Sequence, residues 1–175
     1  MTSLSPSDQE SIIRLCERHE ETHRLEACYH RCVELGSWFI KYDGHRTLEP
    51  EYKTHEFLYN KAFGDSDAPR IPRIVAYFSP KQQWAYLVTE RIDPKTPADV
   101  APEAVAKALQ WLRGVPAPPG LMFGPVGGSR ACHELFRDFQ APLPFLSVKA
   151  LQNYMNRVCP CPCPFLVNWQ PLIII

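Results

Sequence analysis

The stretch between residues 27 and 90 constrains the fold most, because short apolar runs flank a single helical pattern there. Within it, Pro50 suits the first position of a helix, and apolar residues recur at helical spacing as far as about Phe63. The runs typical of strands are residues 27–35, 38–42, 71–78 and 84–90. One helix among several short strands predicts an α+β fold, with a small antiparallel sheet and one packed helix.

Further helices are expected on both sides of this stretch. Residues 5–25 carry Ser7 three positions before Glu10, which is the spacing of a capping box. The other two predicted helices are residues 102–112 and 148–158. Thirteen of the eighteen prolines lie from Pro94 onward, and they interrupt the second half of the chain. These patterns predict an N-terminal helix, a sheet domain, a partial helical lobe and a disordered tail, over residues 1–25, 26–93, 94–158 and 159–175.

The balance of charge and the cysteine count exclude several classes of protein. The chain has 19 basic and 19 acidic residues, so nothing in its net charge favours nucleic acid or a membrane surface as a partner. No apolar run approaches the roughly 18 residues that a membrane span needs, and no secretory signal begins the chain. Seven cysteines cannot all pair, which favours reduced thiols and a cytoplasmic location.

A lysine and two glutamates stand in an arrangement suited to phosphate binding. Lys41 ends the second predicted strand, and Glu51 and Glu56 lie on the helix that follows. The two glutamates are about 140° apart around the helix axis, so they cannot both face Lys41. Leu58 lies two turns after Glu51 on the same face, which favours Glu51 as the partner. The alternative is that Lys41 ends an edge strand in solvent and that both glutamates are surface residues.

Six segments together resemble the fungal branch of the aminoglycoside phosphotransferase and kinase-like family. The resemblance covers roughly residues 30 to 158. The segments that carry it are residues 34–42, 50–59, 71–74, 86–92, 109–116 and 141–145. Their order implies a kinase-like N-terminal lobe followed by an incomplete helical C-terminal lobe. The parent activity would be ATP-dependent phosphoryl transfer to a small-molecule hydroxyl.

The resemblance also implies roles for particular residues. Lys41 matches the lysine that binds the phosphates of ATP, and Glu51 matches the helix glutamate that positions it. Thr89, Glu90 and Ile92 match the hinge, whose backbone hydrogen-bonds adenine in such proteins. ATP is therefore the expected cofactor, with residues 89–92 at its adenine and Lys41 at its phosphates.

The residues that would transfer phosphate do not follow the hinge in this sequence. The family uses a histidine-x-aspartate there, but the only later aspartates, Asp99 and Asp138, are preceded at that spacing by Pro97 and Phe136. No catalytic residue and no metal ligand is therefore assigned, and Mg²⁺ is expected only if the missing part of the lobe were present. The chain is predicted to be a truncated or inactive form, a pseudoenzyme.

Two features predict that ATP binding is weak at best. A single glycine, Gly36, precedes Lys41, where kinases have a Gly-rich loop over the phosphates. Phe39 shares the strand face of Lys41, and its ring would crowd an adenine pocket.

Two other groups of residues raise metal chemistry as an alternative. His19-Glu20-Glu21-Thr22-His23 matches the H-E-x-x-H zinc-protease pattern, although a solvated helix face is the expected reading because the surrounding residues are charged. Cys28, His30 and Cys32 alternate along the predicted strand 27–35, where buried thiols packed as small hydrophobes are favoured over metal ligands. Cys159, Cys161 and Cys163 alternate with proline and predict no defined site.

A non-catalytic protein-interaction module is the alternative function. An incomplete helical lobe would leave apolar helix faces without cover, and such faces recruit protein partners. The residues expected to be exposed are Val105, Leu109 and Leu112 on one helix and Leu151 and Met155 on another.

Overall fold

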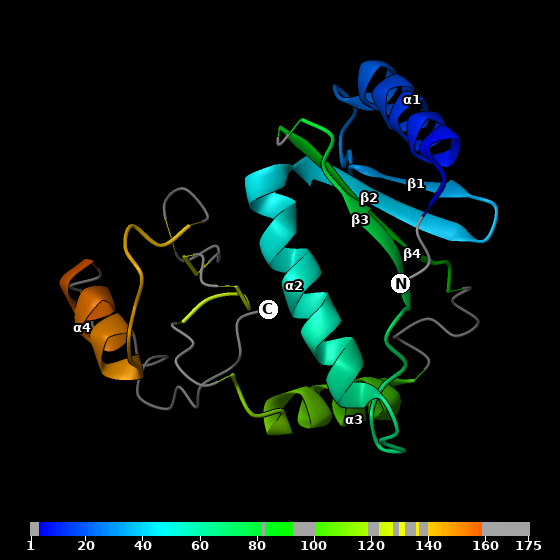
Figure 1. Ribbon diagram of the computed structural model, residues 1–175. Coiled ribbons are helices and arrows are strands. Elements are labelled where there is room, and N and C mark those ends of the chain that lie inside the picture. Colours follow the sequence, from blue (N-terminus) through cyan, green and yellow to red (C-terminus); the bar gives the residue numbers. More distant parts are fainter. Residues whose placement is uncertain are drawn as a thin grey trace. The chain divides into compact units, whose positions relative to one another are not determined.

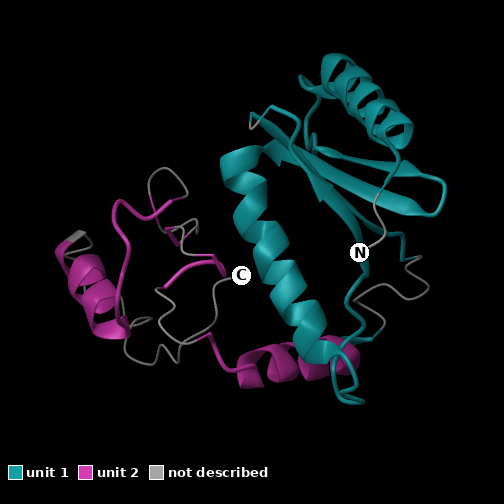
Figure 2. Ribbon diagram, in the orientation of Figure 1, with its two compact units in different colours: residues 1–102 teal, residues 103–175 magenta. Residues whose placement is uncertain are grey.

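The structure is a computed structural model of the 175-residue chain (Figure 1). It describes residues 4–81, 83–92, 101–118, 123–127, 130–131, 136 and 140–158. The chain divides into two compact units, Met1–Pro102 and Glu103–Ile175 (Figure 2). The predicted disordered tail, residues 159–175, lies outside the described residues, as do residues 93–100 around the start of the predicted helical lobe.

The first unit is built on a small antiparallel sheet, as the sequence predicts. Its strands lie in the order β1-β2-β4-β3, and every neighbouring pair is antiparallel. The strands are β1 (Cys32–Leu35), β2 (Trp38–Gly44), β3 (Ile74–Phe78) and β4 (Trp84–Glu90). The pairing of β3 with β4 shifts register between Ile74 and Ala76, so β3, an edge strand, carries a bulge there.

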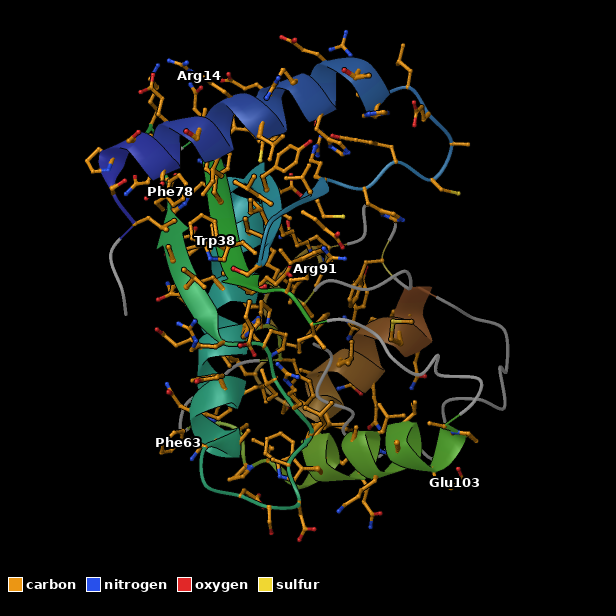
Figure 3. The ribbon with its side chains drawn as sticks, turned by 90° about the vertical axis from the view of Figure 1, so that its right-hand side faces the viewer. Arg14, Trp38, Phe63, Phe78, Arg91 and Glu103 are labelled. Atoms are coloured by element: carbon orange, nitrogen blue, oxygen red, sulfur yellow. The ribbon has the colours of Figure 1, made fainter. Side chains whose placement is uncertain are left out.

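Each face of the sheet is covered by one helix, because apolar side chains alternate along the strands. On β2, Ile40 and Tyr42 lie in a cluster with Ile12 and Cys16 of α1 (Pro6–His23). On β4, Ala85 and Leu87 lie in a second cluster with Leu48 of α2 (His45–Ala62). Trp38 and Phe78 pack against the α1 cluster and lie between that helix and the sheet (Figure 3). One packed helix was expected; the N-terminal helix, predicted as a separate segment, packs against the sheet as well.

α1 begins within one residue of its predicted start at residue 5, whereas α2 begins five residues before its predicted start at Pro50. The cap of α1 is Ser5, whose hydroxyl accepts a hydrogen bond from the Asp8 N–H at 3.1 Å, so the expected Ser7–Glu10 capping box is not the one used. α2 begins at His45, and Pro50 therefore stands inside the helix. The five additional residues bring Leu48 into the core, where it is completely buried. Its burial offsets the hydrogen bond that Pro50 cannot donate.

The first predicted strand is wrong over residues 27–31. β1 begins only at Cys32, and Cys28 has a φ of 63°, in the left-handed region that a strand cannot contain. The alternation that would place Cys28, His30 and Cys32 on one face is therefore absent. The expected burial of the thiols also fails, because Cys28 is exposed and Cys32 is only half-buried.

The second unit contains α3 (Pro102–Gly114) and α4 (Val148–Val158), close to the predicted bounds. Met155 of α4 is 5% exposed in a cluster with Phe136 and Phe145, so the prediction that this face lacks cover is wrong at Met155. Val105 and Leu109 of α3 are exposed, as expected. Across the described residues, no helix combines the length and the apolar character that crossing a bilayer requires.

Candidate functional site

Lys41 lies on an interior strand of the sheet and not on an edge. The Cα partners of Lys41 are Cys32 on β1 and Leu87 on β4, so backbone pairing holds its strand on both sides. Ile40 and Tyr42 turn toward α1, and the side chain of Lys41 consequently projects toward the α2 face. The alternative in which Lys41 ends an edge strand is therefore wrong as to the edge.

Lys41 and Glu51 form an ion pair. The Lys41 Nζ donates to both Glu51 carboxylate oxygens, each at 2.7 Å. Glu56 points elsewhere, because its Oε1 accepts a hydrogen bond from the Tyr52 hydroxyl at 2.8 Å. Of the two glutamates considered, the structure brings only Glu51 to the lysine.

The position of Glu51 follows from the way α2 packs. Leu48 and Leu58, three residues before and seven after Glu51, are both buried, so Glu51 lies on the helix face that meets the sheet. His55 shares this face, and its Nε2 lies 2.7 Å from the carbonyl oxygen of Pro72. The helix is thus anchored on both sides of the glutamate, which holds the carboxylate at a fixed place relative to β2.

The ion pair is open to solvent. Both side chains are 43% exposed, and an exposed pair of this kind stabilises a fold by about 0–1 kcal/mol. Because the ion pair is exposed and contributes little to stability, the Lys41 ammonium can also contact an anion from solution. Chemically, the pair provides a positioned cation at the α2 face of the sheet.

Most backbone N–H groups of the predicted hinge residues donate hydrogen bonds to neighbouring residues of the first unit. The N–H of Glu90 donates to Arg73 O at 2.9 Å, and the N–H of Arg91 donates to Ser37 O at 2.8 Å. Thr89 is buried, and its hydroxyl donates to Phe39 O at 3.3 Å. Within the described part of the chain, no hydrogen bond of the Ile92 N–H is found, which leaves Ile92 as the donor that an adenine could use.

The H-E-x-x-H residues belong to a hydrogen-bond network between α1 and the sheet. The Glu20 carboxylate accepts hydrogen bonds from the Tyr29 hydroxyl and from Arg31 Nε. His19 Nδ1 lies 2.7 Å from the Tyr42 hydroxyl, and His23 instead meets Glu26. The two histidines and the glutamate that a zinc-protease site would need are thus already in contact with other residues of the protein. Among the residues with described positions, no three His, Cys, Asp or Glu side chains lie together as metal ligands.

This network is expected to make the stability of the fold depend on pH. Hydrogen bonds from Arg31 and Tyr29 hold the pKa of Glu20 below its usual value of 4.5. A carboxyl with a lowered folded-state pKa stabilises the fold above its unfolded pKa and loses that contribution as the pH falls. We expect Glu20→Gln to be less stable than the wild type at pH 7 and the difference to shrink as the pH is lowered from about 5 to about 3. Urea unfolding at several pH values measures this, and a constant difference would contradict it.

Sequence reasoning missed a group of aromatic residues on the α1 face. Tyr42 and Tyr86 are opposite one another on β2 and β4, and Trp84 lies two residues before Tyr86 on the same face. The signal was available, because aromatic residues at positions 84 and 86 alternate along a predicted strand. Together with α1 they line a cavity.

Comparison with known proteins assigns no family to the chain. No protein-family model matches it, and the searches of curated proteins and of solved structures found no match either.

Proposed function

We propose that the unit Met1–Pro102 is a kinase-like nucleotide-binding lobe. In this proposal Lys41 binds the phosphates of ATP, Glu51 holds the lysine in place, and the backbone around Glu90 to Ile92 meets the adenine. The observation that carries the proposal is the 2.7 Å contact of Lys41 Nζ with both oxygens of Glu51. A strand lysine held by a glutamate of the following helix is the arrangement that kinases use to bind nucleotide phosphates.

Three further features support this proposal. The order of elements is a lysine strand, a glutamate helix and two more strands, of which the last leads into residues 89–92. The ion pair is accessible to solvent, so a phosphate can reach the ammonium. α1 packs on the opposite face of the sheet, so it does not cover Lys41.

The proposed activity is binding and not transfer. None of the six histidines stands two residues before an aspartate, so the sequence has no histidine-x-aspartate to act on a phosphate acceptor. Binding is expected to be weak, because Phe39 lies beside Lys41 on the same strand face, and only Gly36 precedes that lysine where a Gly-rich loop would cover the phosphates.

Thermal melting with ATP, in the presence and absence of Mg²⁺, tests the proposal. A ligand that binds only the folded state raises the melting temperature, and at ten times its Kd the gain is about 1.4 kcal/mol. For a unit of this size that corresponds to a rise on the order of 5–10 °C. We expect Lys41→Ala to abolish the rise and Glu51→Gln to reduce it.

Lys53→Ala is the matched control. Lys53 pairs with Glu49 at 2.9 Å on the same helix, and its side chain is 40% exposed, close to the 43% of Lys41. The Lys53→Ala variant should keep the full rise in melting temperature. If the wild type shows no rise at millimolar ATP, or if both lysine variants lose it equally, Lys41 is not a specific phosphate-binding residue.

A second candidate function is a protein-interaction module, favoured by the exposed apolar face of α3. Val105 and Leu109 are 41% and 54% exposed at helical spacing. We expect light scattering to show a defined oligomer that Leu109→Glu dissociates, if this face binds a protein. If the wild type and Leu109→Glu are both monomeric at high concentration, the nucleotide proposal is the better account.

A further inference from the structure

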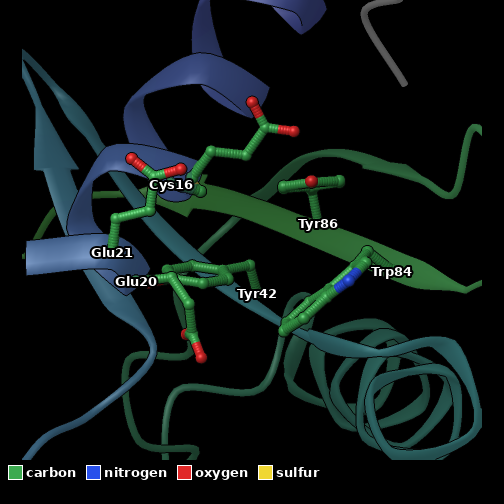
Figure 4. A pocket seen from close by; sticks show the side chains of 7 residues that line it. Cys16, Glu20, Glu21, Tyr42, Trp84 and Tyr86 are labelled. Atoms are coloured by element: carbon green, nitrogen blue, oxygen red, sulfur yellow. The ribbon is translucent and has the colours of Figure 1, made fainter. Parts of the chain in front are cut away.

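A cavity of about 180 Å³ lies between α1 and the sheet, on the face opposite to Lys41. Tyr42, Trp84 and Tyr86 supply its aromatic wall from the sheet, and Cys16 supplies an apolar position from α1 (Figure 4). The volume corresponds to about six water molecules at about 30 Å³ each, so a small organic molecule fits.

The aromatic rings of the wall are held in place by packing. The centroid of Tyr42 lies 6.1 Å from that of Trp84 and 6.5 Å from that of Tyr86. Phe78 lies beside the wall and stacks on Tyr86, with the two ring centroids 5.0 Å apart. Rings with a fixed orientation present their negative faces at a defined place, and a cation within about 6 Å of such a face is attracted.

The protein already uses this wall to hold one of its own cations. The guanidinium carbon of Arg31 lies 5.2 Å from the centroid of the Trp84 ring. Arg31 is in turn engaged by Glu20 and Asp43, each at 3.1 Å, so its charge is balanced by these two carboxylates.

Two exposed carboxylates also stand at the cavity. Glu17 and Glu21 line the cavity from α1, and no ion pair of either is found among the described residues. They lie four residues apart on the helix, where like charges repel one another. A cation bound in the cavity would relieve that repulsion.

A tyrosine hydroxyl also opens onto the cavity, since no fully buried side-chain N or O atom among the described residues lacks a hydrogen-bond partner. Tyr86 is 5% exposed and lines the cavity, yet no hydrogen bond of its hydroxyl to a described residue is found. Burial, followed by the charges at Cys16 and Glu17, raises the pKa of Tyr86 to about 12, so the phenol stays neutral. Burial and then Glu17 likewise raise the pKa of Cys16 to about 12. A ligand in the cavity would therefore meet the neutral side chains of Tyr86 and Cys16, with carboxylates beside them.

We propose that this cavity is a binding site for a small quaternary ammonium ion, with the cation against the aromatic wall of Tyr42, Trp84 and Tyr86 and the carboxylates of Glu17 and Glu21 beside it. A quaternary ammonium ion fits better than a metal ion, because its apolar methyl groups match the rings and Cys16 while its charge is spread over the surface. The site does not depend on nucleotide binding, since Lys41 lies on the other face of the sheet.

Titration of the full chain with choline chloride, followed by the NMR signal of the Trp84 indole N–H, tests the site. We expect a saturable shift of this signal with choline. We expect none with 3,3-dimethylbutan-1-ol, which has the same shape without the charge, and none with potassium chloride at equal ionic strength. Phosphocholine should bind more weakly than choline, because its phosphate meets Glu17 and Glu21; stronger binding would identify a phosphorylated headgroup as the ligand instead and contradict the proposed role of the carboxylates.

Variants of the aromatic wall and of the carboxylates separate the contributions of the rings and of the negative charges to choline binding. Trp84→Leu should weaken choline binding about tenfold or more when followed by calorimetry. The double variant Glu17→Gln/Glu21→Gln changes only exposed side chains, so it should fold normally and weaken choline binding several-fold. Glu10→Gln on the same helix is the matched control, and Lys41→Ala should bind choline as the wild type does. Equal binding of the neutral alcohol, or unchanged choline binding in the double variant, would overturn the proposal.

Discussion

Replacing Leu48 with alanine is expected to lower the free energy of unfolding by about 2–5 kcal/mol. Leu48 is completely buried on α2, in contact with the cluster that includes Ile74, Ala85 and Leu87. Truncation removes apolar contacts and leaves a cavity that the surrounding strands cannot fill without moving. Chemical denaturation followed by circular dichroism measures the change.

Leu25→Ala provides the matched control for Leu48→Ala. It is the same substitution at a leucine that is 91% exposed, so the free energy of unfolding should change by about 0.5 kcal/mol or less. Because Leu48 lies one turn before Glu51, Leu48→Ala should also reduce the rise in melting temperature with ATP, whereas Leu25→Ala should not. Equal destabilisation by the two substitutions would show that α2 does not pack on the sheet as described.

Replacing Ile12 with alanine should be about as damaging, by about 2–5 kcal/mol. Ile12 is completely buried at the centre of the α1 cluster, beside Ile40 and Val88 of the sheet. The expected loss tests whether α1 is part of the sheet domain, because an isolated N-terminal helix would unfold without changing the stability of the sheet. Unfolding should be followed by a probe within the sheet, such as the near-UV signal of its aromatic residues.

The neighbouring residue Ile13 supplies an internal comparison for Ile12. Ile13 is only half-buried and packs at the border of the same cluster. Ile13→Ala should therefore cost less than Ile12→Ala, and both should unfold in a single transition. A wild-type sheet signal in Ile12→Ala would mean that the helix and the sheet are independent.

The sequence predicted best those elements whose signal is local. The strand at residues 84–90 was predicted with the bounds that the structure shows, since its apolar run ends in charged residues and proline. The choice of Glu51 over Glu56 rested on the helix face that Glu51 shares with Leu58 and on the family resemblance, and the structure pairs Glu51 with Lys41. Neither inference needed a contact distant in sequence.

The predictions that failed depended on contacts distant in sequence. Pro50 is a good first residue for a helix, but burial of Leu48 against β3 and β4 extends α2 back to His45. The run at residues 27–35 predicted a strand, but the left-handed backbone at Cys28 ends that pattern before β1. The covering of the sheet by α1 could not be inferred, because the apolar face of that helix is short and its partners lie on three strands.

The edges of the sheet are unsuited to pairing with a second molecule. β1, at one edge, is only four residues long, and β3, at the other edge, carries the bulge between Ile74 and Ala76. Short edge strands and bulges both disrupt the regular row of backbone donors and acceptors that another strand would need. The fold therefore carries its own protection against growth by edge-to-edge addition of strands.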